Sequence, residues 1–317
     1  MKKNNILSVI ILLFAAMIWG FAFVAQDRAS GYVEPFTLNG VRSLIGSFSL
    51  IPVILVMSKK SSRPILEKTK KDRKTLVVAS LICGFALCIS TNIQQFGIAI
   101  YPDTAATSGR SGFLTAMYVI FVPILGLFLK KRPSFTVIIG VLLSIVGLYL
   151  LCFASGLKNI YTGDIIMLSC AVAFSIQILC IDHFKNSVDG VKLSCLQFFI
   201  CGVLSLIMMF IFEKPNMSAI LSQYKEILFL GIFSSGIAYT LQIIGQQYSS
   251  NPTISSIVMS MESVFAAIGG ALIMNERLTT RELSGCFIML LAIIVAQLPS
   301  SLFRKRTPNN FIDSKWQ

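Results

Sequence analysis

Apolar residues along this chain come in long runs that are separated by short polar or basic stretches. A helix of about 20 apolar residues, at 1.5 Å each, is long enough to cross the hydrocarbon of a bilayer. The apolar runs span roughly residues 6–25, 35–57, 76–99, 104–128, 134–153, 163–182, 193–212, 226–247, 253–274 and 282–302. The pattern therefore predicts an all-α integral membrane protein with ten transmembrane helices.

Composition agrees with this pattern and excludes an ordinary soluble fold. Of the 317 residues, 55% are hydrophobic and 13% are charged, whereas a soluble domain carries about 25% charged residues. The formal net charge of +13 comes from residues between the apolar runs, not along one helix face. We therefore expect no nucleic-acid partner, and expect the basic segment 59–74 to contact anionic membrane lipids.

The distribution of Lys and Arg predicts the orientation of the chain. If the N-terminus is cytoplasmic, most of the 27 Lys and Arg residues fall on the cytoplasmic side. This asymmetry predicts a multi-pass protein of the cell (plasma) membrane, a bacterial inner membrane, with both termini cytoplasmic. Residues 304–317 then form a cytoplasmic tail.

The reactive side chains give no sign of a metal or cofactor. All eight cysteines lie in apolar runs without a C-x-x-C pair, so we expect reduced, buried thiols. The single histidine, His183, is more typical of an interfacial residue than of a metal ligand. No G-x-x-x-x-G-K-[ST] run is present, so we expect no nucleotide-driven step.

One acid, Glu262, stands inside the apolar run 253–274, roughly 15 Å from its start. A carboxylate near the bilayer midplane costs at least roughly 2.5–3.5 kcal/mol, so it needs a partner, a proton or a wet cavity. Ala266, Gly269 and Gly270 follow on the same helix face. Small residues there predict that this helix packs closely against a neighbour.

The chain also carries a weak internal repeat. Aligning residues 131–134 (KRPS) with 276–279 (ERLT) places Gly140 on Gly285 without a gap. Each half then holds five spans, an odd number, so the second half enters the membrane inverted. We predict two inverted five-helix repeats, 1–155 and 160–303, around a central site.

Several stretches resemble the drug/metabolite transporter superfamily, specifically its EamA-type ten-helix members. They are Ala16–Phe23 (AMIWGFAF), Pro35–Arg42 (PFTLNGVR), Met261–Ala267 (MESVFAA) and Asn275–Leu278 (NERL). The resemblance implies two inverted repeats, a central cavity and transport of small metabolites, amino acids or drugs. Members often carry Pro after the acid. Ser263 stands there in this chain, and we expect it to straighten the ninth helix.

Charged residues inside the spans are the first candidates for a solute site. Arg110 either reaches the outer interface or clamps an anion, and Arg42 either makes a structural pair or contacts an anion. Glu262 has three open interpretations. It pairs with one of these arginines, binds a cationic group of the solute, or exchanges a proton.

Polar and aromatic residues complete the predicted substrate-binding set. Amides inside spans either bond between helices or line a cavity, and aromatics either pack or form stacking walls. The full predicted set is Arg110, Glu262, Arg42, Asn39, Trp19, Asn92, Gln95, Tyr118, Tyr239 and Gln242.

These observations predict a secondary transporter of a small solute, working by alternating access and in the direction of export. We expect its central site on the third, fourth, eighth and ninth spans. The alternative is an integral-membrane enzyme or a receptor. An enzyme would need a cluster of His or paired acids at one membrane face, and a receptor would need a sizeable extramembrane domain. Neither pattern is present in the sequence.

Overall fold

A computed structural model describes residues 2–60, 70–102, 107–131, 133–152, 161–273 and 279–298. The predicted tail 304–317 and the matched residues Asn275–Leu278 lie outside this part. The helices are α1 (Lys2–Ser30), α2 (Pro35–Lys60), α3 (Lys70–Ala99), α4 (Thr107–Ala116), α5 (Tyr118–Phe128), α6 (Phe135–Cys152), α7 (Thr162–Phe184), α8 (Gly190–Phe212), α9 (Met217–Ser222), α10 (Tyr224–Leu228), η1 (Phe229–Ala238), α11 (Tyr239–Tyr248), α12 (Pro252–Met259), α13 (Glu262–Ile273) and α14 (Thr280–Gln297).

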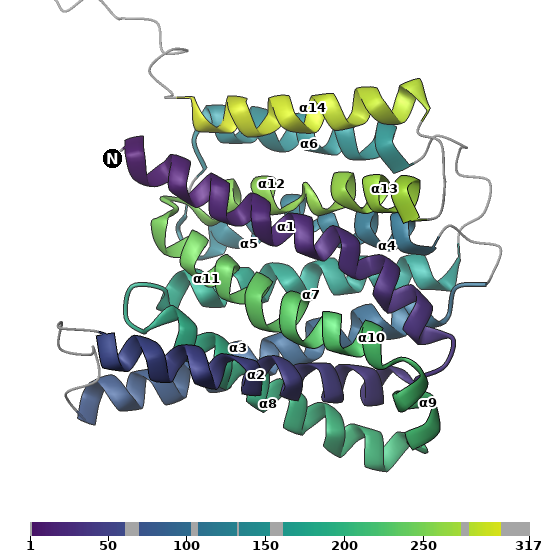
Figure 1. The fold of residues 1–317 in the computed structure, drawn as a ribbon. Helices are drawn as coiled ribbons and strands as arrows, with labels where there is room; N and C mark the ends of the chain where they lie inside the picture. Colours follow the sequence, from purple (N-terminus) through teal and green to yellow (C-terminus); the bar gives the residue numbers. More distant parts are fainter. Residues whose placement is uncertain are drawn as a thin grey trace, which may run out of the picture.

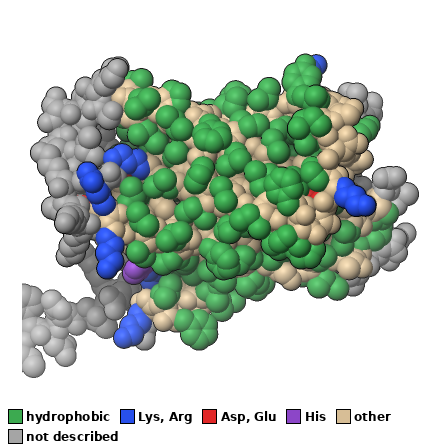
Figure 2. Space-filling view, turned by 90° about the horizontal axis from the view of Figure 1, so that it is seen from below, with side chains coloured by type: hydrophobic (Ala, Val, Ile, Leu, Met, Phe, Trp, Pro, Cys, Tyr) green, Lys and Arg blue, Asp and Glu red, His purple; other side chains and the backbone are tan. Residues whose placement is uncertain are grey.

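The predicted all-α membrane fold is confirmed, and each predicted span corresponds to a helix or a series of helices. Eight segments of the described chain are long and apolar enough to cross a membrane, and shorter apolar helices cover Phe135–Leu150 and Leu283–Gln297. Figure 2 shows hydrophobic side chains over the broad middle of one face, with most of the visible Lys and Arg along one edge. This is the surface of a bundle that stands in lipid.

Three of the predicted spans are not single α-helices. The fourth breaks at Met117 between α4 and α5, and the ninth breaks at Ser260–Met261 between α12 and α13. The eighth runs through the π-helical segment η1. The expectation of a straight ninth helix is therefore wrong. Ser263 Oγ donates to the carbonyl of Gly112 across the helix pair, 3.0 Å away.

The packing of α6 on α14 supports the inverted repeat. A methyl group on Gly140 would lie 3.0 Å from the carbonyl oxygen of Ala292, and one on Gly147 would lie 2.9 Å from that of Gly285. The alignment found in the sequence places Gly140 on Gly285 and therefore Gly147 on Ala292. Under this alignment the contact of Gly140 with Ala292 becomes the contact of Gly285 with Gly147. As one residue number rises the other falls, so the two helices run antiparallel, as inverted halves require.

A second pair of helices shows the same exchange. A methyl group on Gly40 of α2 would lie 2.7 Å from Leu206 Cδ2 of α8, and one on Gly202 would lie 2.7 Å from Leu44 Cδ2. The local sequences are G-V-R-S-L at 40–44 and G-V-L-S-L at 202–206. This short internal repeat was not recognised in the sequence analysis.

The remaining contacts follow the same rule. α3 packs on α7 as α1 packs on α11, and α3 packs on α8 as α2 packs on η1. α1 contacts α12 and α13 as α7 contacts α4 and α5. In Figure 1, α1 begins and α14 ends at the same end of the bundle. Two halves of opposite direction thus enclose a centre bounded by α1, α7 and the broken helices.

Candidate functional site

A small cavity lies where the two halves meet. Its volume is about 30 Å³, which is room for about two water molecules. Its lining residues are Trp19, Phe23, Gln26, Arg42, Gln94, Thr115, Tyr118, Phe174, Ile178, Ser234, Tyr239, Gln242, Met259 and Glu262. A pocket for a small organic solute measures about 300–1,000 Å³. The structure therefore represents a closed state that must expand to hold a solute.

The structure brings six of the ten predicted site residues to this cavity. They are Arg42, Glu262, Trp19, Tyr118, Tyr239 and Gln242. The other four lie elsewhere in the bundle. They are Asn39, Asn92, Gln95 and Arg110. The third, fourth, eighth and ninth spans contribute as expected, but α1, α2 and α7 contribute too.

Arg42 is a buried cation without a buried anion beside it. Its side chain is 4% exposed. Its Nη1 donates to Gln26 Oε1 and its Nε to Asn39 Oδ1, both at 3.0 Å. No ion pair joins it to a carboxylate in the described part of the chain. Asn39 is fixed in turn by Thr91 and Ser205, at 2.9 and 3.2 Å. The amides orient the guanidinium, and its charge stays uncompensated.

Glu262 is a buried acid that lines the same cavity. It is 3% exposed and begins α13, directly after the break in the ninth span. Tyr118 is an electrostatic neighbour of the carboxyl group, but no hydrogen bond of normal geometry joins the two side chains. Among described residues, neither Arg42 nor Arg110 forms an ion pair with it. The structural pairing considered in the sequence analysis is therefore not formed in this conformation.

Tyr239 lines the cavity together with Arg42 and Glu262. Its hydroxyl interacts electrostatically with both Arg42 and Glu262. Its ring packs edge-to-face on Trp19, with centroids 4.7 Å apart, and on Phe198, at 5.0 Å. Trp19 Nε1 and one oxygen of Glu262 are buried and have no hydrogen-bond partner among the described residues. Such atoms are expensive to bury and are available to a ligand.

The two-fold relation explains several lining residues that were missed. A methyl group on Gly97 of α3 would meet Met167 of α7, and one on Gly245 of α11 would meet Leu12 of α1. When one half is superposed on the other, Gly97 therefore corresponds to Gly245, and Met167 corresponds to Leu12. The same register pairs Trp19 with Phe174, Phe23 with Ile178, and Gln94 with Gln242, all of which line the cavity.

A sequence signal for these residues exists. The stretch I-Q-x-x-G at 93–97 corresponds to L-Q-x-x-G at 241–245. Recognising it would have placed Gln94 beside Gln242 in the site. Gln26, Thr115, Ser234 and Met259 carry no comparable signal. The structure instead gives Asn92 and Gln95 bonds within the bundle, to Ser205 at 2.9 Å and Ser30 at 2.6 Å.

Arg110 closes one end of the bundle. Its Nε and Nη2 donate to the two oxygens of Asp164, at 2.5 and 2.6 Å. Tyr101 donates its hydroxyl proton to the same carboxylate at 2.7 Å, and the backbone N–H of Tyr161 donates at 2.9 Å. Burial and the hydrogen bond to Asp164 raise the pKa of Tyr101, so it remains a donor. We call these residues the Asp164 latch.

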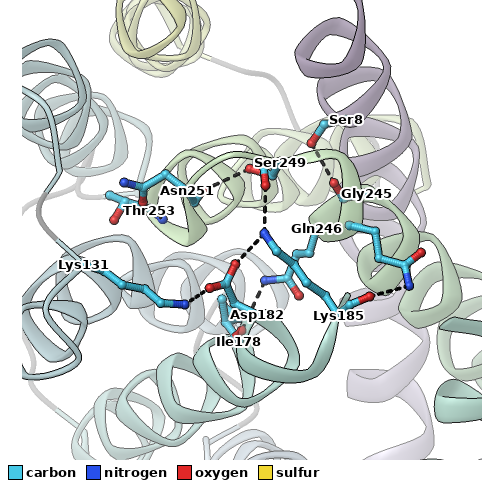
Figure 3. A network of polar contacts seen from close by, with 11 residues as sticks. Ser8, Lys131, Ile178, Asp182, Lys185, Gly245, Gln246, Ser249, Asn251 and Thr253 are labelled. Atoms are coloured by element: carbon cyan, nitrogen blue, oxygen red, sulfur yellow. Dashed lines mark hydrogen bonds and ion pairs between the residues drawn. The ribbon is translucent and has the colours of Figure 1, made fainter. Parts of the chain in front are cut away.

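Asp182 closes the opposite end (Figure 3). It forms ion pairs with Lys131 and with Lys185, the latter at 2.8 Å. Lys185 also donates to the carbonyl of Ser249 at 2.8 Å. Burial lowers the pKa of Lys131, with repulsion from Lys185 adding to the effect, and burial lowers the pKa of Lys185. We call these residues the Asp182 latch.

Both latches join the two halves. Arg110 lies in α4 and Lys131 lies just after α5, both in the first half, whereas Asp164 and Asp182 lie at the two ends of α7, in the second half. The inverted arrangement, the closed central cavity and the two inter-half latches define a membrane transporter of the ten-helix, inverted-repeat class.

Comparison with known proteins agrees with this class. The EamA-like transporter family matches residues 6–153 and 161–297, so the chain belongs to that family. A protein of Archaeoglobus fulgidus named "Uncharacterized transporter" is 29% identical over 90% of this chain and 84% of its own length. "Uncharacterized transporter YoaV" of Bacillus subtilis is 23% identical over 90% of this chain and 94% of its own length. The chain is thus a multi-pass membrane transporter.

A solved crystal structure gives the same fold. It matches with a TM-score of 0.74 over 94% of this chain and 99% of that chain, at 18% identity. At that identity the likeness establishes the fold alone. The solute has to be argued from the cavity itself.

Proposed function

We propose that this transporter moves a small zwitterionic solute, one carrying a carboxylate and an ammonium group beside an apolar or aromatic portion. The observation that carries the proposal is a buried guanidinium and a buried carboxyl group that line one cavity without forming an ion pair with each other. Arg42 offers guanidinium donors to a carboxylate, and Glu262 offers carboxylate oxygens to an ammonium group. Trp19, Phe23 and Tyr239 provide aromatic walls.

The energetics favour a solute that carries both charges. An unpaired ion inside a membrane protein is costly, and two of them on one cavity cost more than one. A solute with a single charge would compensate one residue and leave the other unpaired. A zwitterion pairs with both Arg42 and Glu262, so its binding removes the energetic cost of leaving either residue unpaired.

The two latches support a mechanism of alternating access. In the closed state, one latch ties Arg110 of α4 to the start of α7, and the other ties Lys131, just after α5, to the end of α7. Opening one latch while the other holds would expose the cavity to one side of the membrane only. In this mechanism the two halves rock against each other, and the two latches act as the gates. We retain export, with the Asp182 end cytoplasmic, as the proposed direction.

A matched set of three solutes tests the proposal. The set is an aromatic α-amino acid, the amine that lacks its carboxylate, and the acid that lacks its amine. We expect only the amino acid to raise the unfolding temperature of the purified protein and to show counterflow in proteoliposomes. Equal behaviour of all three solutes, or no effect of any zwitterion, would refute the proposal.

Two variants assign the charges. In Arg42→Gln the preference for the amino acid over the amine should disappear, because the carboxylate has lost its partner. In Glu262→Gln the preference over the acid should disappear instead. If both variants merely weaken all three solutes equally, the two side chains are structural. Vesicles of known orientation, loaded from one side, then measure the direction.

A further inference from the structure

A second hollow lies on the side of α1 that faces away from the central cavity. Its volume is about 350 Å³. Its lining residues are Met17, Ile18, Phe21, Val24, Ala25, Arg28, Lys225, Glu226, Phe229 and Ile273. They come from α1, α10, η1 and α13. We call this hollow the α1 groove.

The α1 groove and the central cavity are separated by a single helix. Trp19, Phe23 and Gln26 line the cavity, whereas Phe21, Val24 and Arg28 line the groove. The two sets fall on different faces of α1, as the helical period requires. A molecule in the groove therefore packs against the wall of the solute site without entering it.

The length of the groove matches one leaflet of a bilayer. Met17 and Arg28 are 11 positions apart on α1, which corresponds to roughly 16 Å along the helix. The hydrocarbon core is about 30 Å thick, so this is about half of it. Below its charged end the groove is lined by aliphatic and aromatic side chains. In a membrane, such a surface is filled by an acyl chain and not by water.

The charged end of the groove lies at headgroup level. Arg28 and Lys225 are exposed, and Lys225 Nζ lies 5.8 Å from the centroid of the Tyr224 ring. Tyr224 is itself exposed, and exposed tyrosines mark the membrane–water interface. Glu226 follows directly and is half-buried. Two cations and one acidic residue thus line the end of the groove that we place at the level of the lipid headgroups.

We propose that the α1 groove binds one phospholipid that carries a primary ammonium group. Its phosphate lies between Arg28 and Lys225, its ammonium group lies at Glu226, and one acyl chain fills the apolar part of the groove. The three charges of the protein complement the phosphodiester and ammonium of that headgroup. A lipid with an anionic headgroup and no amine leaves Glu226 uncompensated. A lipid with a trimethylated amine offers it no N–H donor.

The test compares three lipids that share the same acyl chains. Delipidated protein in detergent is titrated with phosphatidylethanolamine, phosphatidylglycerol and phosphatidylcholine, and the unfolding temperature is recorded. Native mass spectrometry counts the lipids retained. We expect phosphatidylethanolamine to bind about fivefold more tightly than the other two, as a weak surface charge pair allows. Equal binding of all three, or preference for phosphatidylglycerol, would overturn the proposal.

Variants locate the site. Glu226→Gln should abolish the preference for phosphatidylethanolamine over phosphatidylglycerol, and the double variant R28Q/K225Q should lower the affinity for both. Lys214→Gln is the matched control, because Lys214 is an exposed cation beyond the end of α8 and outside the groove. If the control changes lipid affinity as much as the double variant does, general surface charge explains the binding and the proposed site is wrong.

Discussion

In the first half of the chain, Trp19, Phe23 and Gln94 line the central cavity. In the second half, Phe174, Ile178 and Gln242 take the exchanged positions. The two halves thus contribute bulky apolar side chains and an identical amide at the exchanged positions. Their charges do not match. The register that places Gly40 on Gly202 pairs Arg42 with Leu204, and the register that places Gly140 on Gly285 pairs Glu262 with Met117.

This difference distinguishes residues that support the two-fold fold from residues that would select the solute. Features that recur in both halves, such as glycine contacts and broken helices, serve the closing and opening of a two-fold structure. Features found in one half only have no such explanation. Arg42 and Glu262 are of the second kind, each buried and each without an ion-pair partner in the described chain. This is why we propose that the solute compensates these two residues.

Arg42→Leu tests this difference most directly, because it gives the first half the residue that the second half carries at the equivalent position, Leu204. We expect transport to fall about 10- to 100-fold, the value of a hydrogen bond to a charged group. We expect little net change in stability, because removing a costly unpaired charge offsets the loss of its hydrogen bonds to Gln26 and Asn39. Proteoliposome flux and the unfolding temperature measure the two effects. A variant that melts earlier but transports normally would show that Arg42 belongs to the scaffold.

Gly140 and Gly147 test the scaffold itself. Valine at either position would overlap α14, so we expect each variant to lose about 1–3 kcal/mol of stability. Because the two contacts exchange, the losses should be similar. Gly109→Ala is the control, since a methyl group there meets no atom within 4 Å. Chemical unfolding in detergent provides the comparison, and strongly unequal losses would contradict the two-fold relation of α6 and α14.

The two latches offer a smaller contrast. Asp164 has one cation and Asp182 has two. Arg110→Met leaves Asp164 with no cationic partner in the described latch, so we expect a loss of about 1–3 kcal/mol. Lys131→Met leaves Asp182 with Lys185 and removes an ammonium whose pKa burial has lowered, so we expect less than about 1 kcal/mol. The same unfolding assay measures both. Equal losses would mean that the second lysine does not compensate.

The lysine pKa values also define a pH dependence. Both lysines of the Asp182 latch have a pKa below 10.5 in the closed state, whereas exposure on opening restores the ordinary value. Protonation therefore favours the open latch, and the closed latch gains stability as the pH rises from the lowered values towards 10.5. The guanidinium of Arg110 stays charged over this range. The Asp182 end should thus open more readily at neutral pH than at a pH above the lowered pKa values.

The sequence predicted the arrangement of the fold better than the details of the site. Hydrophobic runs and the placement of Gly140 on Gly285 were sufficient for ten spans in two inverted halves, because lipid imposes length and polarity directly. Arg110 is an example of a residue whose role the sequence could not decide. Its depth in an apolar run allowed either an interfacial or an anion-binding role, and only the fold brings it to Asp164. No proline lies at the breaks at Met117 and Ser260, so the local sequence did not predict these breaks.

Gln94 and Gln242 give the last and smallest test, and the one most specific to the comparison. Gln94 donates to Thr115 at 3.2 Å, and Gln242 donates to Gln177 at 3.3 Å, so each amide makes one similar bond. Such a bond inside a membrane protein is worth about 0.6 kcal/mol on average, a factor of about three. If the amides belong to the shared scaffold, Gln94→Leu and Gln242→Leu should reduce flux by similar factors for zwitterions, amines and acids alike. A change in solute preference in one variant only would move that glutamine from the scaffold to the group of Arg42 and Glu262.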